Sequence, residues 1–384
     1  MPDSAGPEGR PPEAPRKVSV PGLVDHHAHL LRDAAGVAFP PGTAAVREFH
    51  HKVAAAGTTP MDVLDPPLAE PGLAGRLLAG LSRAAAAGLV EITEMGMRSW
   101  QYLDALAAAQ EAGPLPVRVR IYLASGLAGE ASLDELDARR ADCGPWVRLA
   151  GVKFYADGWL GPRTCALGQD FADVGGAGLL FTDAGRLARR IAPLAGRGWR
   201  IATHAIGDRA AQVVLDAYDL AWDGDQAAIA AAAPRIEHAS VLSADLIARM
   251  AAGGVVACIQ PSFAVTDAAQ LGPALGPGRV ARAYPYTVMA AAGVPMLAGT
   301  DYPIEVLEPL VGLARLVFGR SLRPGFTTAD GAPGHALLPV DRALEMMSDA
   351  GAGQTLVSAD PRAATPDQID LIEVSGTAPA PFPA

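Results

Sequence analysis

Short apolar segments alternate along the chain with longer Ala- and Leu-rich segments, which predicts parallel β-strands separated by helices. We expect strands near residues 22–27, 89–95, 117–124, 151–156, 200–205, 235–239, 255–260 and 295–300. We expect helices that include residues 99–112, 183–196, 208–223 and 243–252, with Ser243 as an N-cap and Gly253 as a stop. Eight strands in this order fit an α/β fold, the closed (β/α)8 TIM-like barrel. A doubly wound open sheet is the competing arrangement.

Polar residues of chemical interest gather at the carboxyl ends of these strands, where barrel enzymes build their active sites. In Val24-Asp25-His26-His27-Ala28-His29, two histidines are separated by one residue. Strand side chains alternate in direction, so His27 and His29 point the same way and can hold one ion, while His26 faces the other side. The alternative is that they are simply polar residues at a strand end.

A lysine follows in the fourth predicted strand. Lys153 lies between apolar neighbours, so burial should lower the pKa of its amine. A neutral amine can react with carbon dioxide to give an anionic carbamate. Pairing of Lys153 with Asp157 or another carboxylate explains the pattern equally well at this point.

Further candidates follow the later strands. They are His204 and Asp208 after 200–205, Glu237 and His238 within 235–239, and Asp301 after 295–300. Each alone could be structural, and Asp208 could cap the next helix. Four of the eight histidines nevertheless lie at strand ends together with Lys153 and Asp301, which favours one shared site.

Composition bounds the function. With 384 residues, 50% hydrophobic and 19% charged, the chain can bury a large core. A net charge of -10 argues against a nucleic-acid partner. Three separated cysteines predict no disulfide framework and favour a reducing compartment. No run of about 18 apolar residues is present, so we expect no membrane span.

The first 16 residues hold five prolines and no apolar core of the kind that a signal peptide needs. We therefore expect a flexible leader over residues 1–16 and a cytoplasmic protein.

The order of these motifs resembles that of the amidohydrolase superfamily, and within it the amidohydrolase 3 (YtcJ-like) group. The likeness is carried by residues 21–29, 153–158 with Arg163 and Thr164, 204–209, 235–239, Gln260 with Pro261, and 299–303. It covers roughly residues 21–313 and is specific because several ordered motifs coincide. His26, His50 and His51 lack a comparable context.

The resemblance implies a centre of two divalent metal ions. Its ligands would be His27, His29 and Asp301 for one ion, His204 and His238 for the other, and a CO2-derived carbamate on Lys153 as the bridge. Zinc is the first choice because imidazole and carboxylate ligands suit it. A bridging water would be acidified to hydroxide, one ion would polarise a carbonyl, and Asp301 would carry the proton to the departing amine. The implied reaction is hydrolysis of a C–N bond in a small molecule: an amide, an N-acyl or N-formyl amine, or a cyclic amide.

Other residues would have supporting roles. Arg163 and Trp159 follow the fourth strand and could contact the substrate from a loop. Asp157, Asp208 and Glu237 would orient metal ligands or cap helices.

The ends of the chain depart from the family pattern. Relatives begin with several strands that join the chain end in a small sandwich, whereas only about residues 17–20 are available here. We therefore expect a barrel over residues 17–345 and a reduced β-sandwich, with residues 346–384 supplying a strand near 368–374. An exposed barrel edge would favour a homodimer. Two other functions stay open: a mononuclear-metal deaminase of the same superfamily, and a non-catalytic ligand-binding barrel.

Overall fold

The computed structural model describes residues 17–68, 72–319, 337–369 and 371–383, and the leader predicted over residues 1–16 lies outside this range. Eight parallel strands follow one another in chain order across the sheet. They are β1 (Val18–Ala28), β2 (Leu89–Met97), β3 (Arg118–Ala124), β4 (Val147–Tyr155), β5 (Arg200–Ala205), β6 (Arg235–His238), β7 (Val256–Ile259) and β8 (Met296–Ala298). The eight predicted strands are therefore confirmed, with ends that differ by a few residues.

The segment that follows β8 lies against β1 and closes the barrel. Asp301 N donates to His27 O at 2.7 Å, and His29 N donates to Tyr302 O at 2.7 Å. Gly299 allows this approach, because a Cβ at this position would lie 2.3 Å from His27 N. The strands therefore form a barrel rather than an open doubly wound sheet.

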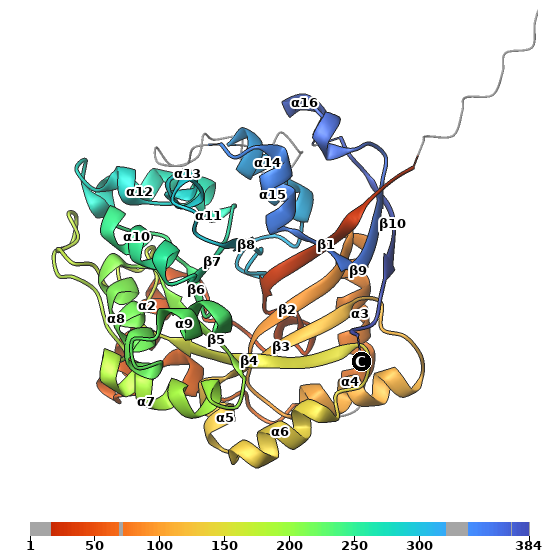
Figure 1. Ribbon diagram of the computed structural model, residues 1–384, viewed down its shortest axis with the longest axis horizontal. Coiled ribbons are helices and arrows are strands. Elements are labelled where there is room, and N and C mark those ends of the chain that lie inside the picture. Colours follow the sequence, from red (N-terminus) through yellow and green to blue (C-terminus); the bar gives the residue numbers. More distant parts are fainter. Residues whose placement is uncertain (1–16, 69–71, 320–336, 370, 384) are drawn as a thin grey trace, which may run out of the picture.

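Helices cover the outside of the strands (Figure 1). They are α1 (Leu30–Ala34), α2 (Gly42–Ala55), α3 (Leu73–Ala86), α4 (Gln101–Glu111), α5 (Ser125–Gly129), α6 (Leu133–Ala141), α7 (Ala184–Ala195), α8 (Asp208–Ala221), α9 (Gln226–Ala232), α10 (Ala244–Ala252), α11 (Phe263–Thr266), α12 (Ala268–Leu275), α13 (Tyr286–Ala291), α14 (Pro309–Phe318), α15 (Val340–Met346) and α16 (Pro366–Ile369). Short 3-10 helices lie at Pro60–Asp62, Val280–Arg282 and Pro361–Ala363. The N-cap predicted for Ser243 is confirmed, since its side chain accepts a hydrogen bond from Leu246 N. Over the described part of the chain, no helix has the length and apolar character needed to cross a bilayer.

The end of the chain extends the sheet beyond β1. Strands β9 (Ser348–Val357) and β10 (Val374–Pro379) run antiparallel to their neighbours in the order β10-β9-β1 and lie together at the right of Figure 1. The strand expected near 368–374 is wrong in position: residues 366–369 form α16, where Gln368 Oε1 accepts a hydrogen bond from Thr365 N as in a capping box. The β-sandwich and the domain boundary at residue 345 stay predictions.

Candidate metal centre

The ring of His27 is held in one tautomer by β6. Its Nδ1 lies 2.5 Å from Glu237 Oε2, and Arg235 binds the same carboxylate through Nε at 2.7 Å. Burial alone would raise the pKa of Glu237. The charge of Arg235 instead holds this pKa well below its usual range. An ionised carboxylate only accepts hydrogen bonds, so Nδ1 carries the proton and Nε2 keeps a lone pair for a metal ion. The predicted orienting role of Glu237 therefore has a geometric basis.

Two more imidazoles, those of His204 and His238, each keep one ring nitrogen with a free lone pair. His204 Nε2 lies 3.0 Å from Gly158 O, which leaves Nδ1 as the acceptor. His238 Nδ1 lies 2.7 Å from Gln260 Oε1, which leaves Nε2. The His238 ring centroid is 4.4 Å from that of His204 and 4.9 Å from that of His27. Burial lowers the pKa of His238 to about 3 and that of His204 well below its usual value, so both rings are neutral at pH 7, the form that binds metals.

Asp301 completes this cluster after β8. Its Oδ1 lies 3.2 Å from His29 Nε2 and 3.5 Å from His27 Nε2. His27, His238 and Asp301 each place one possible ligand atom within 4.8 Å of the others. Burial opposes ionisation, but the neighbouring histidines dominate and lower the pKa of Asp301 to about 2. Its backbone has a φ of +59°, a strained value for a residue with a side chain.

Asp25 holds the strained segment in place. Its carboxylate accepts hydrogen bonds from His27 N at 3.0 Å and from Thr300 Oγ1 at 2.6 Å, so it joins β1 to the end of β8. The side chains of His29 and Asp301 are thereby fixed relative to one another.

Lys153 lies on β4 with its side chain almost fully buried. Its Nζ has no hydrogen-bond partner among the described residues, and burial lowers the pKa of the amine to about 8. The alternative pairing with Asp157 is wrong. The Asp157 carboxylate accepts instead from the backbone N–H groups of Ala166, Ile206 and Gly207 at 2.8, 3.0 and 2.8 Å.

These groups fit metal ions. Lys153 Nζ, His204 Nδ1 and Asp301 Oδ1 are buried and make no hydrogen bond within the described part of the chain. Leaving a buried polar group unsatisfied costs about 1–3 kcal/mol, so three such atoms on predicted ligands indicate a missing partner. A cavity of about 30 Å³ is lined by His27, Lys153, His238 and Asp301 among others. This is about the volume of one water molecule, a size suited to ions or ordered water.

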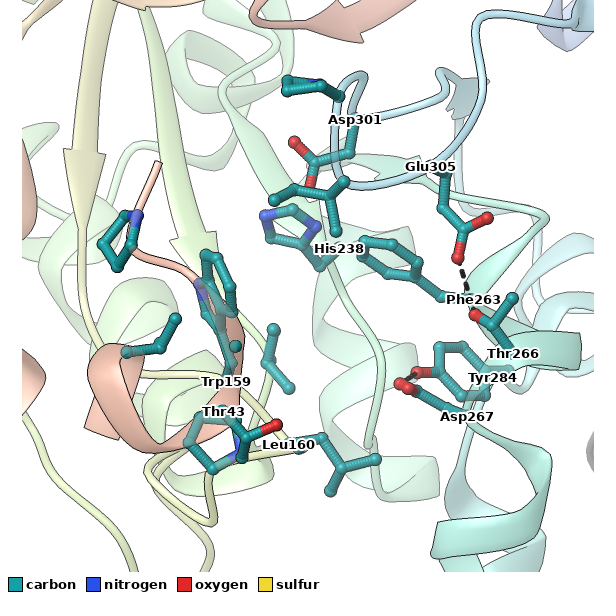
Figure 2. Close-up of a pocket in the computed structure, with 18 residues that line it drawn as sticks. Thr43, Trp159, Leu160, His238, Phe263, Thr266, Asp267, Tyr284, Asp301 and Glu305 are labelled. Atoms are coloured by element: carbon teal, nitrogen blue, oxygen red, sulfur yellow. Dashed lines mark hydrogen bonds between the residues drawn. The ribbon is translucent and has the colours of Figure 1, made fainter. Parts of the chain in front are cut away.

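A larger cavity of about 380 Å³ opens at His238 and Asp301 (Figure 2). Asp267 and Glu305 also line it, and we call this space the acidic cavity. Thr266 Oγ1 donates to Glu305 at 2.7 Å, and Tyr284 donates to Asp267. Much of the other lining is apolar, including Val46, Trp159, Leu160, Ile206, Phe263 and Ile304. Its size and mixed lining suit a small-molecule ligand.

The two predicted substrate contacts have different surroundings. Trp159 lines the acidic cavity. The Arg163 guanidinium instead binds Asp173 at 2.8 Å, Leu160 O at 2.9 Å and Gln270 Oε1 at 3.0 Å, and Arg163 is not part of the wall. Arg163 therefore organises the loop after β4. Its contact with a substrate stays a prediction.

Asp208 and His26 also lie apart from the ligand atoms. Asp208 Oδ1 accepts from Gly168 N at 2.7 Å and from Arg209 N, so its contacts tie a loop to the start of α8; the N-cap of that helix is Gly207. For His26, burial and the nearby charge of Arg235 lower the pKa to about 3. No contact of its ring with a predicted ligand appears within the described ranges.

Two residues of the site had no role assigned from sequence. Gln260 fixes the tautomer of His238, and its only signal was its place in the family-like segment Gln260-Pro261. Tyr155 stacks on His204 with ring centroids 3.6 Å apart and 13° between the planes. No local sequence pattern marks that stack, because the two residues lie on neighbouring strands.

Comparisons with known proteins show the family of the chain. A model of the amidohydrolase family matches residues 42–357, a range that begins after His27 and His29 and includes the other four predicted ligands. The chain is 27% identical over 300 residues, 72% of its length, to the putative amidohydrolase YtcJ of Bacillus subtilis (strain 168). That match covers 53% of the relative, so the chain spans about half the length of this curated protein.

Two solved structures share the fold. They are uncharacterized metal-dependent hydrolases from Pyrococcus furiosus and Pyrococcus horikoshii OT3, with TM-scores of 0.65 and 0.67 and sequence identities of 20% and 19%. The matches cover 94% and 91% of this chain and 85% and 88% of those chains. At these identities the likeness supports the α/β barrel fold.

Proposed function

Because the chain belongs to the amidohydrolase family, a family of hydrolases, we propose that it hydrolyses a C–N bond in a small molecule with the help of two divalent metal ions. The bond would be that of an amide, an N-acyl or N-formyl amine, or a cyclic amide. This proposal rests on three ligand atoms that are buried and unsatisfied in the described structure: Lys153 Nζ, His204 Nδ1 and Asp301 Oδ1.

Each ion has a set of residues to hold it. His27, His29 and Asp301 would bind one ion, His204 and His238 the other, and carboxylated Lys153 would bridge them. Attack of the neutral Lys153 amine on carbon dioxide forms an N–C bond and releases one proton. The lowered pKa of Lys153 and the lack of a hydrogen-bond partner for its Nζ among the described residues favour that step. Imidazole and carboxylate donors suit zinc first, although manganese, iron, cobalt or nickel could also bind them.

When bound, the ions would polarise the substrate carbonyl and acidify a water molecule. Asp301 would act as the proton carrier between that water and the leaving nitrogen. Two observations support this role. Asp301 lines both the small cavity among the ligands and the acidic cavity, and its carboxyl has a pKa of about 2, so it is ionised at neutral pH and has no proton of its own.

Part of the substrate would lie in the acidic cavity, beside His238 and Asp301. Trp159 and Phe263 would cover the apolar part of a bound molecule and exclude water from the reacting bond. Glu237 and Gln260 would keep the imidazoles in the tautomers that bind metal.

Hydrolysis by the metal-loaded protein tests the proposal. We expect turnover of at least one class in a panel of amides, N-formyl and N-acyl amines, lactams and cyclic imides, and loss of that turnover in Asp301→Asn. A single tightly bound ion, with no carbon dioxide adduct on Lys153, would indicate the mononuclear deaminase instead. Binding of a panel member without any turnover would indicate the non-catalytic barrel.

A further inference from the structure

A second cavity, of about 390 Å³, reaches the candidate metal centre at His29. Its aromatic walls come from Phe39, Phe49, Tyr155 and Trp159. Two arginines, Arg32 and Arg98, also line it, and within the described part of the chain no Asp or Glu does. We call this space the basic cavity.

Arg98 has hydrogen-bonding capacity to spare. Its Nη1 donates to Val63 O at 2.9 Å, and its Nη2 lies 4.0 Å from Met61 Sδ, a weak acceptor. Within the described ranges no carboxylate lies at ion-pair distance from this guanidinium. A guanidinium offers five N–H donors, and its planar fork matches a carboxylate.

Among the described residues, the guanidiniums of Arg32 and Arg98 outnumber the ionised carboxylates near them. Arg32 Nε binds Asp65 Oδ1 at 2.9 Å, and the other oxygen of Asp65 accepts from Tyr102 at 2.8 Å. Burial raises the pKa of the nearby Glu94 to about 8, so Glu94 is mostly neutral at pH 7, and among the described residues two guanidiniums face one ionised carboxylate. Burial and the charge of Arg32 lower the pKa of Arg98 only to about 10, so it remains a cation at neutral pH.

The basic cavity adjoins the metal ligands. The Arg32 guanidinium lies 4.6 Å above the ring of Phe39, whose centroid is 5.8 Å from that of His29. His29, Phe39, Met61, Tyr155 and Trp159 line both the basic cavity and the small cavity among the ligands. A substrate bound at the metal centre can therefore extend into the basic cavity.

The two large cavities differ in charge. The described lining of the acidic cavity includes Asp267, Asp301 and Glu305 but no Lys or Arg, and both cavities share Trp159. Glu305 pairs with the buried Arg315 at 3.7 Å, whereas two guanidiniums line the basic cavity, so a carboxylate would bind more favourably in the basic cavity.

We propose that the basic cavity binds a carboxylate carried by one arm of the substrate, with Arg98 as its partner and Arg32 beside it. This inference rests on the proposed function and narrows it to amides with a free carboxylate on one side of the scissile bond, such as N-acyl amino acids. The other arm, uncharged or bearing hydrogen-bond donors, occupies the acidic cavity. The difference in charge between the two cavities then sets the direction in which the substrate binds.

Calorimetric titration of the metal-loaded protein tests this assignment. The probes are N-acetylalanine, N-acetylleucine and N-acetylphenylalanine, each paired with its uncharged primary amide. We expect at least one acid to bind about tenfold or more tighter than its amide. A charge-assisted hydrogen bond of the usual strength predicts that Arg98→Gln weakens binding of that acid by roughly 10- to 100-fold and leaves amide binding within about twofold.

Controls separate binding from folding. Arg249→Gln removes a guanidinium that pairs with Asp216 and Asp219 on the outer helices, and it should leave both affinities unchanged. Arg98→Lys keeps the charge without the fork and should retain part of the preference. If Arg98→Gln does not fold, the salt dependence of wild-type binding replaces it as the test. The affinity for the acid should fall between 20 and 300 mM NaCl, whereas the affinity for the amide should not.

Three results would overturn the inference: equal affinity for acid and amide in every pair, equal loss of both in Arg98→Gln, or no binding of any probe. Hydrolysis assays on the same samples separate it from the proposed function. Turnover of amides with no preference for a carboxylate would refute the basic-cavity assignment alone. Arg98-dependent binding of an acid without hydrolysis of any substrate would refute the proposed function alone.

Discussion

Replacing Glu237 by Gln should weaken both the fold and metal binding, because this one carboxylate serves two buried partners. It accepts from His27 Nδ1 at 2.5 Å and from Arg235 at 2.7 and 3.0 Å. Gln keeps one oxygen acceptor but turns an NH2 group toward the other donor, and it leaves the buried Arg235 without its counter-charge. Breaking a buried ion pair on one side costs about 3–5 kcal/mol.

Thermal denaturation measures the first effect. With an unfolding entropy of roughly 2.1 cal/mol/K per residue, a chain of 384 residues changes its Tm by about 1.2 °C per kcal/mol, so Glu237→Gln should lower the Tm of the metal-free protein by roughly 4–6 °C. Metal titration measures the second, because loss of a group that orients a histidine ligand typically lowers metal affinity by about 10- to 100-fold.

Glu345→Gln is the matched control. Glu345 pairs with Arg342 at 3.2 Å on the surface, where an ion pair contributes little, and the change should leave Tm and metal affinity as in the wild type. A Glu237→Gln protein that matched this control in both measurements would refute the idea that the carboxylate holds His27 and Arg235 in place.

Asp301→Asn should cut the turnover of whichever substrate is found by about 10²- to 10⁴-fold while the circular dichroism spectrum stays unchanged; near-normal turnover would show that another group carries the proton. Gly299→Ala places a methyl group 2.3 Å from His27 N and should lower the Tm by an amount equivalent to about 1–3 kcal/mol. Gly272→Ala is the control, because a Cβ there meets no atom within 4 Å beyond its chain neighbours and its own helix backbone, and it should not lower the Tm. Equal Tm values for the two variants would contradict the tight closure of the barrel. Burial raises the pKa of Glu94 from 4.5 to about 8, so the folded protein holds a proton that the unfolded chain releases above pH 4.5. The stability from this proton is complete below pH 4.5 and is lost as the pH rises toward 8, so Glu94→Gln should flatten the decline of Tm over that window; parallel wild-type and variant curves would exclude this contribution.

The barrel could be predicted because its strands and helices follow from patterns within short stretches of sequence. Each parallel strand is a short apolar run followed by a helical segment, and the chemically useful residues end those strands. The same argument placed His204 on β5 and Lys153 on β4 before their neighbours were known. It missed β9, whose sequence contains Gly351 and Gly353 and has no regular alternation of apolar and polar residues.

The detailed contacts of the site depend on distant segments, so no local pattern reveals them. Among the described residues Lys153 Nζ has no hydrogen-bond partner, and Asp157 instead accepts from backbone groups up to 50 residues away. The proposed role of Arg98 depends on contacts with Met61 and Val63, which precede β2 in the chain. Arg98 itself matched no motif. The walls of both large cavities likewise come from several loops.

Metal content per chain tests the central claim most directly. Purified protein saturated with zinc, dialysed and analysed by inductively coupled plasma mass spectrometry should hold two ions per chain. Lys153→Ala should hold one ion or fewer, and Lys52→Ala, which changes an exposed lysine on α2, should still hold two. One ion or none in the wild type, or two ions in Lys153→Ala, would contradict a two-metal centre bridged by Lys153.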